Sequence, residues 1–372
     1  MSQYLRETPQ RITVLLPDLR GGGAERMHVD MAKVWLEQGF AVDFVLLKKQ
    51  GELLPLLPEA VSVVDLGAKR YRSALFPLLR YLRATKPDVL LAAMWPITVI
   101  AIVARWISRQ KTRVIVSDHN TLSNSYADRG ILHRLFLRLS MRMAYPFADV
   151  RIAVSKGVAT DLSCLSGLNE SCFTVIYNPA AKQNNVPQHE DRPEGLIPDA
   201  KILLSVGTLK YQKNHELLIK AFSKIPAHMN TQLCILGEGV LRPQLEELVR
   251  ISNLEGRVFM PGFCTHPSTY YNAADLFVLS SHYEGFGNVI VEALECGIPV
   301  VSTDCPSGPS EILCDGKYGR LVPTGDVDAL ASAMISALQD THDHNALKLR
   351  ALDFSVEKIS NEYLNAMFPS NN

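Results

Sequence analysis

The sequence predicts an α/β protein of two domains, each a parallel sheet with helices on both faces. At 372 residues the chain has the length of two ordinary domains, each with its own core. Short β-branched runs alternate with helical patterns through both halves, as in successive βα units. A polar, proline-containing segment without periodicity, residues 181–199, separates the two series. We therefore place the domain boundary near residue 180.

The first half contains six strand-like runs, in order ITVLL, AVDFVLL, VSVVDL, DVLLAAM, RVIVSD and VRIAVS. Helical patterns lie between them at residues 25–38 and 77–85, and another helix is expected from about residue 97. Ser155 is expected to begin a helix directly after the last run. These elements predict a first Rossmann-like, doubly wound domain over residues 1–180.

The second half repeats the scheme with KILLSVG, TQLCILG, RVFMPG, LFVLS and IPVVST. Its helices include residues 216–223 and 242–252, and Asp326 is expected to cap a further helix. Together they predict a second Rossmann-like domain over residues 181–352. Residues 353–372 form a separate helical segment, whose apolar positions 356, 359, 363 and 367 share one face.

Composition excludes several classes of protein. An apolar content of 47% with 20% charged residues is typical of a globular chain, not a disordered one. The polar N-terminus and the short apolar run after it do not form a signal peptide, so we expect a cytoplasmic protein. Seven cysteines without a CxxC pair argue against a disulfide framework or a structural zinc site. The apolar run at residues 89–103 is shorter than a membrane span and is divided by Pro96.

The net charge of zero conceals two oppositely charged halves. Residues 1–180 contain 23 Lys and Arg against 15 Asp and Glu, and residues 181–372 contain the reverse. Basic amphipathic stretches lie at residues 69–86 and 133–147; in the second, Arg134, Arg138 and Arg142 share one helix face among leucines and phenylalanines. This face either binds anionic lipid headgroups or is an ordinary solvated helix face. Nucleic acid is not expected, because no stacking motif accompanies the charge.

A glycine-rich turn follows the first strand. Gly21, Gly22 and Gly23 precede a helix, so backbone N–H groups and the helix N-terminus could hold a phosphate. The pattern is not GxGxxG, and its helix has no acidic partner at the spacing of a dinucleotide site. Taken alone, the turn fits a structural role as well as a binding role.

Two carboxylates eight positions apart follow the run LFVLS. Gly285 and Gly287 give Glu284 a bare backbone loop at a helix start, and Glu292 lies two turns along that apolar helix. A carboxylate in such surroundings needs hydrogen-bond or charged partners, and sugar or ribose hydroxyls would serve. The alternative is that Glu292 caps the helix or pairs with a local lysine.

The segment from Glu284 to Glu292 matches the E-x7-E signature of retaining glycosyltransferases with the GT-B fold. The surrounding text, SHYEGFGNVIVEALECGIPVVSTDCPSGPSEIL, resembles glycosyltransferase family 4, and GGGAER resembles the glycine-rich loop of its bacterial surface-polysaccharide members. The resemblance covers residues 11–366. It implies two Rossmann-like domains facing a central cleft, with residues 353–372 crossing back to the N-terminal domain.

The resemblance also implies roles for individual residues. Glu284 would lie against the donor sugar, Glu292 would bind the ribose, and Gly22 and Gly23 would face the diphosphate and the acceptor side. Lys213 in VGTLKYQKN would contact the donor diphosphate, where a cation stabilises the departing nucleoside diphosphate.

His119 in VIVSDHN resembles the histidine near the donor sugar, although a lone loop histidine is more often structural. The remaining positions implied for substrate binding are Gly207, Thr208, Lys210, Gly285, Phe286, Gly287, Asn288, Ser307 and Gly308, with Pro309 and Glu311 beside them. One position departs from the family: Thr208 stands where an arginine is usual. Lys210, or Arg20 or Arg26 from the other domain, are the candidates to supply the missing charge.

The expected function is transfer of a hexose or N-acetylhexosamine from a UDP-sugar to a glycan acceptor, with retained anomeric configuration. The acceptor is expected to be lipid-linked and the protein peripheral on the inner face of the plasma membrane. No cofactor or metal is expected, because the one Asp-x-Asp spacing, Asp326 to Asp328, suits a helix cap.

Two other functions are compatible with this architecture. A sugar-nucleotide epimerase would consume no acceptor, and the spacing of Glu284 and Glu292 argues against it. A non-catalytic component that binds nucleotide sugar is favoured slightly by Thr208, but the otherwise complete set of site residues opposes it.

Overall fold

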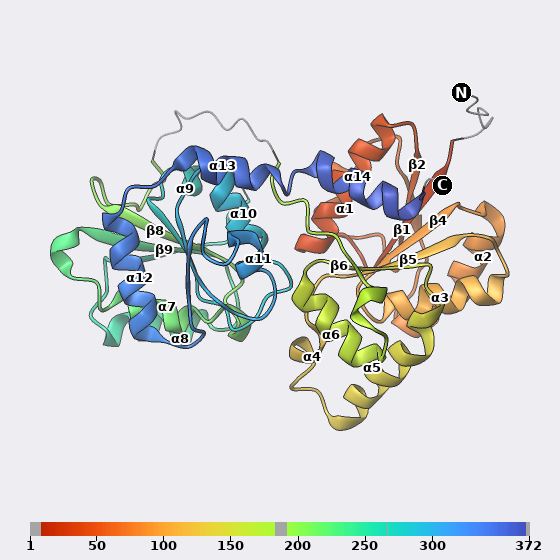
Figure 1. The fold of residues 1–372 in the computed structure, drawn as a ribbon, viewed down its shortest axis with the longest axis horizontal. Coiled ribbons are helices and arrows are strands. Elements are labelled where there is room, and N and C mark those ends of the chain that lie inside the picture. The colour runs from red at the N-terminus through yellow and green to blue at the C-terminus, as the bar shows by residue number, and fades with distance from the viewer. Residues whose placement is uncertain (1–8, 183–191, 266, 370–372) are drawn as a thin grey trace. The chain divides into compact units, whose positions relative to one another are not determined.

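A computed structural model describes residues 9–182, 192–265 and 267–369 of the chain. The chain divides into two compact units: Met1–Pro179 with Val356–Asn372, and Ala180–Ser355. Each unit is built on one parallel sheet with helices packed against it (Figure 1). The predicted fold class, two doubly wound α/β domains, is therefore confirmed.

The first unit has a seven-stranded sheet in the order β3-β2-β1-β4-β5-β6-β7. Its strands are β1 (Arg11–Leu16), β2 (Ala41–Leu46), β3 (Ser62–Asp65), β4 (Val89–Ala93), β5 (Arg113–Asp118), β6 (Val150–Ala153) and β7 (Thr174–Val175). Helices cover both faces, so central strands such as β4 are buried along their whole length. The strand order reverses between β1 and β4, and doubly wound sheets bind ligands at the carboxyl ends beside such a point.

The helices of the first unit are α1 (Gly23–Glu37), α2 (Leu75–Thr85), α3 (Ile97–Ser108), α4 (Leu122–Ser125), α5 (Ile131–Ala144), α6 (Lys156–Ser166) and α14 (Val356–Met367). The predicted start of α6 is confirmed, because the Ser155 hydroxyl accepts a hydrogen bond from the Val158 N–H at 3.1 Å. Short 3₁₀ turns lie at Leu54–Leu56, Tyr71–Ala74, Tyr145–Phe147 and Glu170–Cys172.

The last helix completes the core of the first unit. In Figure 1 the dark-blue α14 lies against the red α1, and Trp35 of α1 donates a hydrogen bond to the Ser360 carbonyl at 3.4 Å. Ile359, Tyr363 and Met367 of α14 are fully buried in the same cluster as the strand residues. The helix begins at Val356, and residues 353–355 before it belong to the second unit.

The second unit has a six-stranded sheet in the order β10-β9-β8-β11-β12-β13. Its strands are β8 (Lys201–Val206), β9 (Thr231–Leu236), β10 (Val258–Gly262), β11 (Leu276–Leu279), β12 (Val300–Thr303) and β13 (Arg320–Val322). Its helices are α7 (His215–Phe222), α8 (Arg242–Ile251), α9 (Ser268–Asn272), α10 (Asn288–Glu295), α11 (Pro309–Leu313), α12 (Val327–Gln339) and α13 (His344–Leu352), with 3₁₀ turns at Tyr211–Lys213 and Ala227–Met229. Asp326 caps α12 as predicted, accepting from the Ala329 N–H at 2.9 Å.

The apolar run at residues 89–103 is divided between β4 and the first turns of α3. Among the helices of the described ranges, none combines the length and the apolar character needed to cross a membrane.

Candidate functional site

An ion pair at the carboxyl edge of the second sheet is the centre of the site. Lys213 follows β8 and Glu284 follows β11, and Lys213 Nζ lies 2.6 Å from Glu284 Oε1. The two side chains are only 16% and 7% exposed. The Ser281 hydroxyl donates to the same carboxylate oxygen at 2.6 Å. Because adjacent parallel strands end at the same edge, the fold brings together two charges that lie 71 residues apart.

In the loop after β8, the Lys213 side chain packs over Gly207. A Cβ built on Gly207 would lie 3.2 Å from Lys213 Cε, and one built on Gly237 would lie 2.0 Å from the Gly207 carbonyl oxygen. Close backbone approach therefore requires glycine at position 237, directly after β9. Burial and the neighbouring Lys213 charge lower the pKa of Lys210, so these two lysines are close in space.

The structure bears on which cation replaces the missing arginine at Thr208, which is exposed. Lys210 belongs to the same loop as Lys213. In the first unit, Arg20 is paired with Asp18 at 2.8 Å and Arg26 with Asp30 at 3.3 Å. Lys210 is thus the candidate that the second unit itself brings near Lys213.

The backbone from Gly285 to Asn288 leads into α10. Gly287 has φ +108° and occupies the N-cap position, a conformation that favours glycine. The Phe286 side chain is buried and packs edge-on against Phe354, with ring centroids 5.3 Å apart. Only the backbone of Phe286 is therefore placed to meet a ligand.

The loop after β12 contains two residues with positive φ, and for the serine this conformation costs free energy. Ser307 has φ +73° and Gly308 has φ +102°, and a Cβ on Gly308 would lie 1.7 Å from the Phe286 carbonyl oxygen. The Ser307 hydroxyl is buried and has no hydrogen-bond partner in the described part of the chain. A left-handed serine with an unsatisfied hydroxyl is typical of a site that a ligand completes.

Glu292 of α10 has a partner that the sequence did not indicate. Glu292 Oε2 accepts a hydrogen bond from the Tyr271 hydroxyl at 2.9 Å. Tyr271 is buried, and burial together with the Glu292 charge raises its pKa well above the ordinary value. Tyr271 lies in the five-residue helix α9, 21 residues before Glu292, and no local motif marks it.

In the first unit the Glu25 carboxylate lies over the glycine-rich turn. Gly22 is the N-cap of α1, and a Cβ there would lie 2.1 Å from Glu25 Oε2. Gly23 begins the helix. Burial and the nearby Asp18 charge raise the pKa of Glu25. The Glu25 carboxylate therefore lies over Gly22 at the start of α1.

His119 stands directly after β5 at the carboxyl edge of the first sheet. Its Nε2 lies 3.0 Å from Ser117 Oγ and its Nδ1 lies 3.4 Å from Asn178 Oδ1. The ring of His28 meets it edge-on at 5.6 Å. Burial and the neighbouring His28 lower the pKa of His119 to about 3, and burial lowers that of His28 to about 4. Both imidazoles are therefore neutral at physiological pH.

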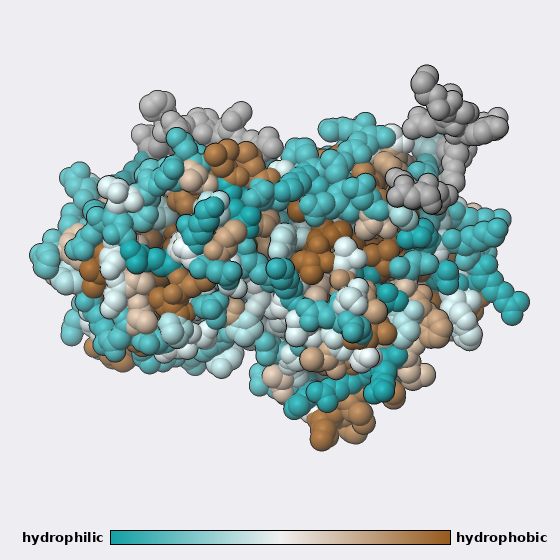
Figure 2. All heavy atoms as spheres, viewed as in Figure 1, coloured by the Kyte–Doolittle hydropathy of each residue, from teal (hydrophilic) through white to brown (hydrophobic). Residues whose placement is uncertain are grey.

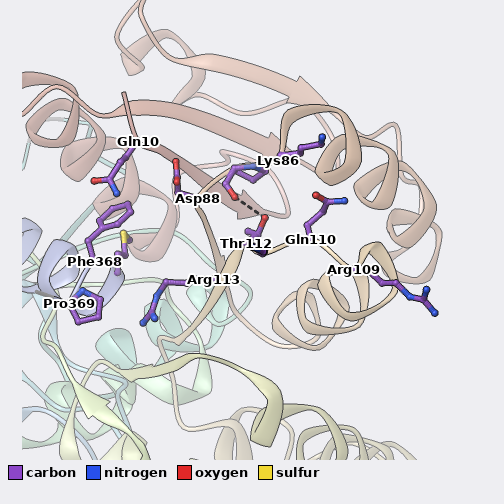
Figure 3. Close-up of a pocket in the computed structure, with 12 residues that line it drawn as sticks. Gln10, Lys86, Asp88, Arg109, Gln110, Thr112, Arg113, Phe368 and Pro369 are labelled. Atoms are coloured by element: carbon purple, nitrogen blue, oxygen red, sulfur yellow. Dashed lines mark hydrogen bonds between the residues drawn. The ribbon is translucent and has the colours of Figure 1, made fainter. Parts of the chain in front are cut away.

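A pocket of about 850 Å³ lies at the opposite edge of the first sheet (Figure 3). It is lined by residues that lie just before β1, β4 and β5, by the first residue of β5, and by the end of α14 with the two residues after it. In Figure 3 the guanidinium groups of Arg109 and Arg113 point in different directions. Because doubly wound sheets bind ligands at their carboxyl ends, this pocket is not the candidate active site.

No group of three or more His, Cys, Asp or Glu side chains is placed to hold a metal ion within the described residues.

Comparison with known proteins identifies the family. Residues 21–181 match the family model Glycosyltransferase Family 4, and residues 187–352 match Glycosyl transferases group 1. The chain is 33% identical over 269 residues to the N-acetylgalactosamine-N,N'-diacetylbacillosaminyl-diphospho-undecaprenol 4-alpha-N-acetylgalactosaminyltransferase of Campylobacter jejuni, covering 71% of this chain and 72% of that protein. The chain belongs to glycosyltransferase family 4. The family 4 chain is also 24% identical to the amylovoran biosynthesis glycosyltransferase AmsD of Erwinia amylovora, covering 80% and 81%.

Solved structures identify the fold of this glycosyltransferase. HepE of Anabaena, solved with UDP-glucose, is similar with a TM-score of 0.82 at 22% identity, covering 96% of this chain and 99% of that one. The lipopolysaccharide outer core galactosyltransferase WaaB gives a TM-score of 0.77 at 20% identity, with 96% and 99% covered. The fold of the family 4 chain is GT-B.

Proposed function

We propose that this glycosyltransferase moves a hexose or N-acetylhexosamine from a UDP-sugar to a lipid-linked glycan acceptor, with retention of anomeric configuration. The observation that carries the proposal is the buried pair of Lys213 and Glu284 at the carboxyl edge of the second sheet. A buried carboxylate and ammonium are costly to desolvate, and a pair at a ligand-binding edge is better explained by chemistry than by stability.

The two residues of the pair can serve the two parts of the donor, Lys213 the leaving diphosphate and Glu284 the transferred sugar. The Lys213 ammonium has three N–H donors and uses one on Glu284, so others remain for the oxygens of a leaving diphosphate. Negative charge grows on that diphosphate as the glycosidic bond breaks, and a fixed cation in a site of low polarity stabilises it. Glu284 lies against the sugar in this scheme. Lys213 and Lys210 together supply the positive charge, so we propose a reaction without metal or cofactor.

Three features support a nucleotide sugar as donor. The unsatisfied Ser307 hydroxyl offers a hydrogen bond to a ligand. Glu292, oriented by Tyr271, offers its carboxylate to ribose hydroxyls. HepE, which shares the fold, was solved with UDP-glucose. These features support UDP-sugar as the donor class.

Two features support a lipid-linked acceptor at an anionic membrane. The Campylobacter relative is named for a diphospho-undecaprenol acceptor. In this chain the surface of α5 and the turn after it exposes seven large apolar side chains, each between 53% and 81% exposed: Ile131, Leu132, Leu135, Phe136, Leu139, Met143 and Phe147. Figure 2 shows hydrophobic side chains gathered where α5 begins in Figure 1.

The charge of α5 favours a membrane over a second protein as the partner of this surface. Arg134, Arg138 and Arg142 are interleaved with the apolar residues and exposed. Apolar side chains that enter the acyl boundary beside arginines that meet phosphate headgroups are the pattern of an interfacial helix. We propose a peripheral protein on the inner face of the plasma membrane, bound through α5.

The test is nucleoside diphosphate release from UDP-, GDP- and ADP-sugars in EDTA, with and without membrane lipid extract. We expect release from one UDP-sugar, stimulated by lipid, and an α-configured linkage retained from donor to product by NMR. Lys213→Met should abolish release, whereas Lys220→Met should not, because Lys220 pairs with Glu216 on the exposed face of α7.

The other outcomes separate the alternatives. Isomerised donor without diphosphate release would establish the epimerase. UDP binding without release from any donor, with or without lipid, would establish the non-catalytic component.

A further inference from the structure

The buried face of α14 reaches the loop that carries His119. Tyr363 of α14 is fully buried, and its hydroxyl lies 3.1 Å from Ser117 Oγ on β5. Ser117 is also fully buried, and its hydroxyl lies 3.0 Å from His119 Nε2. A continuous hydrogen-bonded path therefore runs from the C-terminal helix to the imidazole, wholly inside the first unit.

The chemistry of the partners fixes the direction of each bond. Asn178 Oδ1 can only accept, so His119 Nδ1 carries the proton of the neutral ring. Nε2 is then unprotonated and accepts a hydrogen bond from the Ser117 hydroxyl. Ser117 has one hydroxyl proton and uses it on Nε2, so its oxygen accepts the hydrogen bond from the Tyr363 hydroxyl.

The Tyr363 hydroxyl is not needed to hold α14 in place. Trp35 binds the Ser360 carbonyl, and Gln38 donates to Asn361 Oδ1 at 2.9 Å. Ile359 and Met367 bury the rest of the helix face. A phenylalanine would fill the same volume, so the hydroxyl serves the path to the imidazole rather than the packing.

We propose that Tyr363 is a positioning residue for His119: through Ser117 it holds the neutral imidazole in the tautomer with the proton on Nδ1. The Nε2 side of the ring is anchored by this path, whereas within the described part of the chain the Nδ1 proton has one long hydrogen bond, to Asn178 at 3.4 Å. The Nδ1 proton is the one that a sugar oxygen can take over. The role of His119 in transfer rests on the proposed function, whereas the tautomer rests on the hydrogen bonds alone.

The test compares Tyr363→Phe and Ser117→Ala with the matched control Gln38→Ala, which removes another hydrogen bond of α14 away from His119. Long-range ¹⁵N–¹H NMR of the full chain, with ¹⁵N-labelled histidine and His119→Gln for assignment, reports the tautomer directly. We expect Nδ1-protonated His119 in the wild type and Gln38→Ala, and a mixture of tautomers in the other two. We also expect kcat to fall roughly fivefold in Tyr363→Phe with little change in donor KM, as for one lost hydrogen bond.

Unchanged tautomer and kcat in both Tyr363→Phe and Ser117→Ala would overturn the proposal, as would Nε2-protonated His119 in the wild type. The NMR readout requires no activity. Full activity of His119→Gln would instead contradict the role of His119 in the proposed function, so the two failures are distinguishable.

Discussion

At the scale of single residues, the candidate site contains a serine that lowers the stability of the folded chain and gains no hydrogen bond within it. Ser307 combines a left-handed backbone with a buried hydroxyl that has no partner among the described residues. Ser281, in the loop after β11, is the opposite case, because its hydroxyl donates a hydrogen bond to Glu284. A ligand would supply the missing partner of Ser307, whereas Ser281 is satisfied already.

This contrast gives a prediction for Ser307→Ala. The free energy of unfolding should stay the same or rise slightly, because no protein hydrogen bond is lost, whereas UDP affinity should fall roughly fivefold. Ser281→Ala should lower the stability by about 1 kcal/mol, since Glu284 loses a donor. Chemical unfolding and calorimetric titration with UDP measure both quantities. Lower stability with unchanged affinity in Ser307→Ala would show that its hydroxyl has a structural partner instead.

The lowered pKa values of His28 and His119 predict a loss of stability of the first unit in acid. The folded pKa of His28 is about 4, against an ordinary value of 6.5, so between these pH values the unfolded chain binds a proton that the folded chain does not. His28 therefore lowers the stability by about 3 kcal/mol as the pH falls through this range. Asp118, with its pKa raised to about 6 by burial, acts in the opposite direction over part of the same range.

The comparison that isolates His28 is His28→Asn, because an asparagine N–H can replace Nδ1 at the Ala24 carbonyl. Urea unfolding at pH 7, 6, 5 and 4 should show a shallower decline in the variant than in the wild type. Equal slopes would mean that His28 is not neutral in the folded protein.

Of the residues in the candidate site, the sequence motifs include the charged ones but not their hydrogen-bond partners. Glu284, Lys213 and Glu292 stand in motifs with a recognisable spacing. Tyr271 and Ser117 have no local pattern, because their roles come from contacts made 21 and 246 residues away, with Glu292 and Tyr363. Only the folded chain brings such partners together.

At the scale of elements, length decided what could be predicted. The six strand-like runs of the first half and the five of the second all form strands. The missed strands, β7 and β13, have two and three residues and are too short for a periodic pattern. The α5 helix was predicted from its spacing, but periodicity alone left open whether its apolar residues were buried; the structure buries only Leu137, Met141 and Ala144 of this helix.

The exposed residues of α5 predict a membrane-binding phenotype. Leu135→Gln with Phe136→Gln should abolish co-sedimentation with phosphatidylglycerol vesicles at any salt concentration. Replacing Arg134, Arg138 and Arg142 by glutamine should weaken it by about two orders of magnitude at low salt, at about 1 kcal/mol for each arginine. Val240→Gln, a comparably exposed apolar residue of the second unit, is the control. Vesicle binding that survives the paired substitution on α5 would assign the membrane contact to another surface.

At the scale of the whole molecule, the first unit is made of two separate parts of the chain. The α14 helix contributes four buried apolar side chains to its core: Ile359, Tyr363, Leu364 and Met367. At about 2 kcal/mol for each buried side chain, this helix supplies about 8 kcal/mol, which is as large as the net stability of a typical domain.

A chain that ends at residue 355 should therefore lose the unfolding transition of the first unit and keep that of the second. Differential scanning calorimetry and binding of a hydrophobic dye would detect the change. The fragment 180–355, which is contiguous and has its own core, should unfold cooperatively. A fragment 1–179 that unfolds cooperatively at the wild-type temperature would contradict the prediction.

The place of α14 also sets the order in which the protein can fold as it is made. The residues that begin the first sheet leave the ribosome first, yet Trp35 and its neighbours remain uncovered until residue 367 has emerged. The second unit is synthesised in between and is complete at residue 355. It can therefore fold before the last helix of the first unit has been made. The nascent first unit consequently presents an apolar surface for most of the time of translation, which is the form of the protein that chaperones would meet.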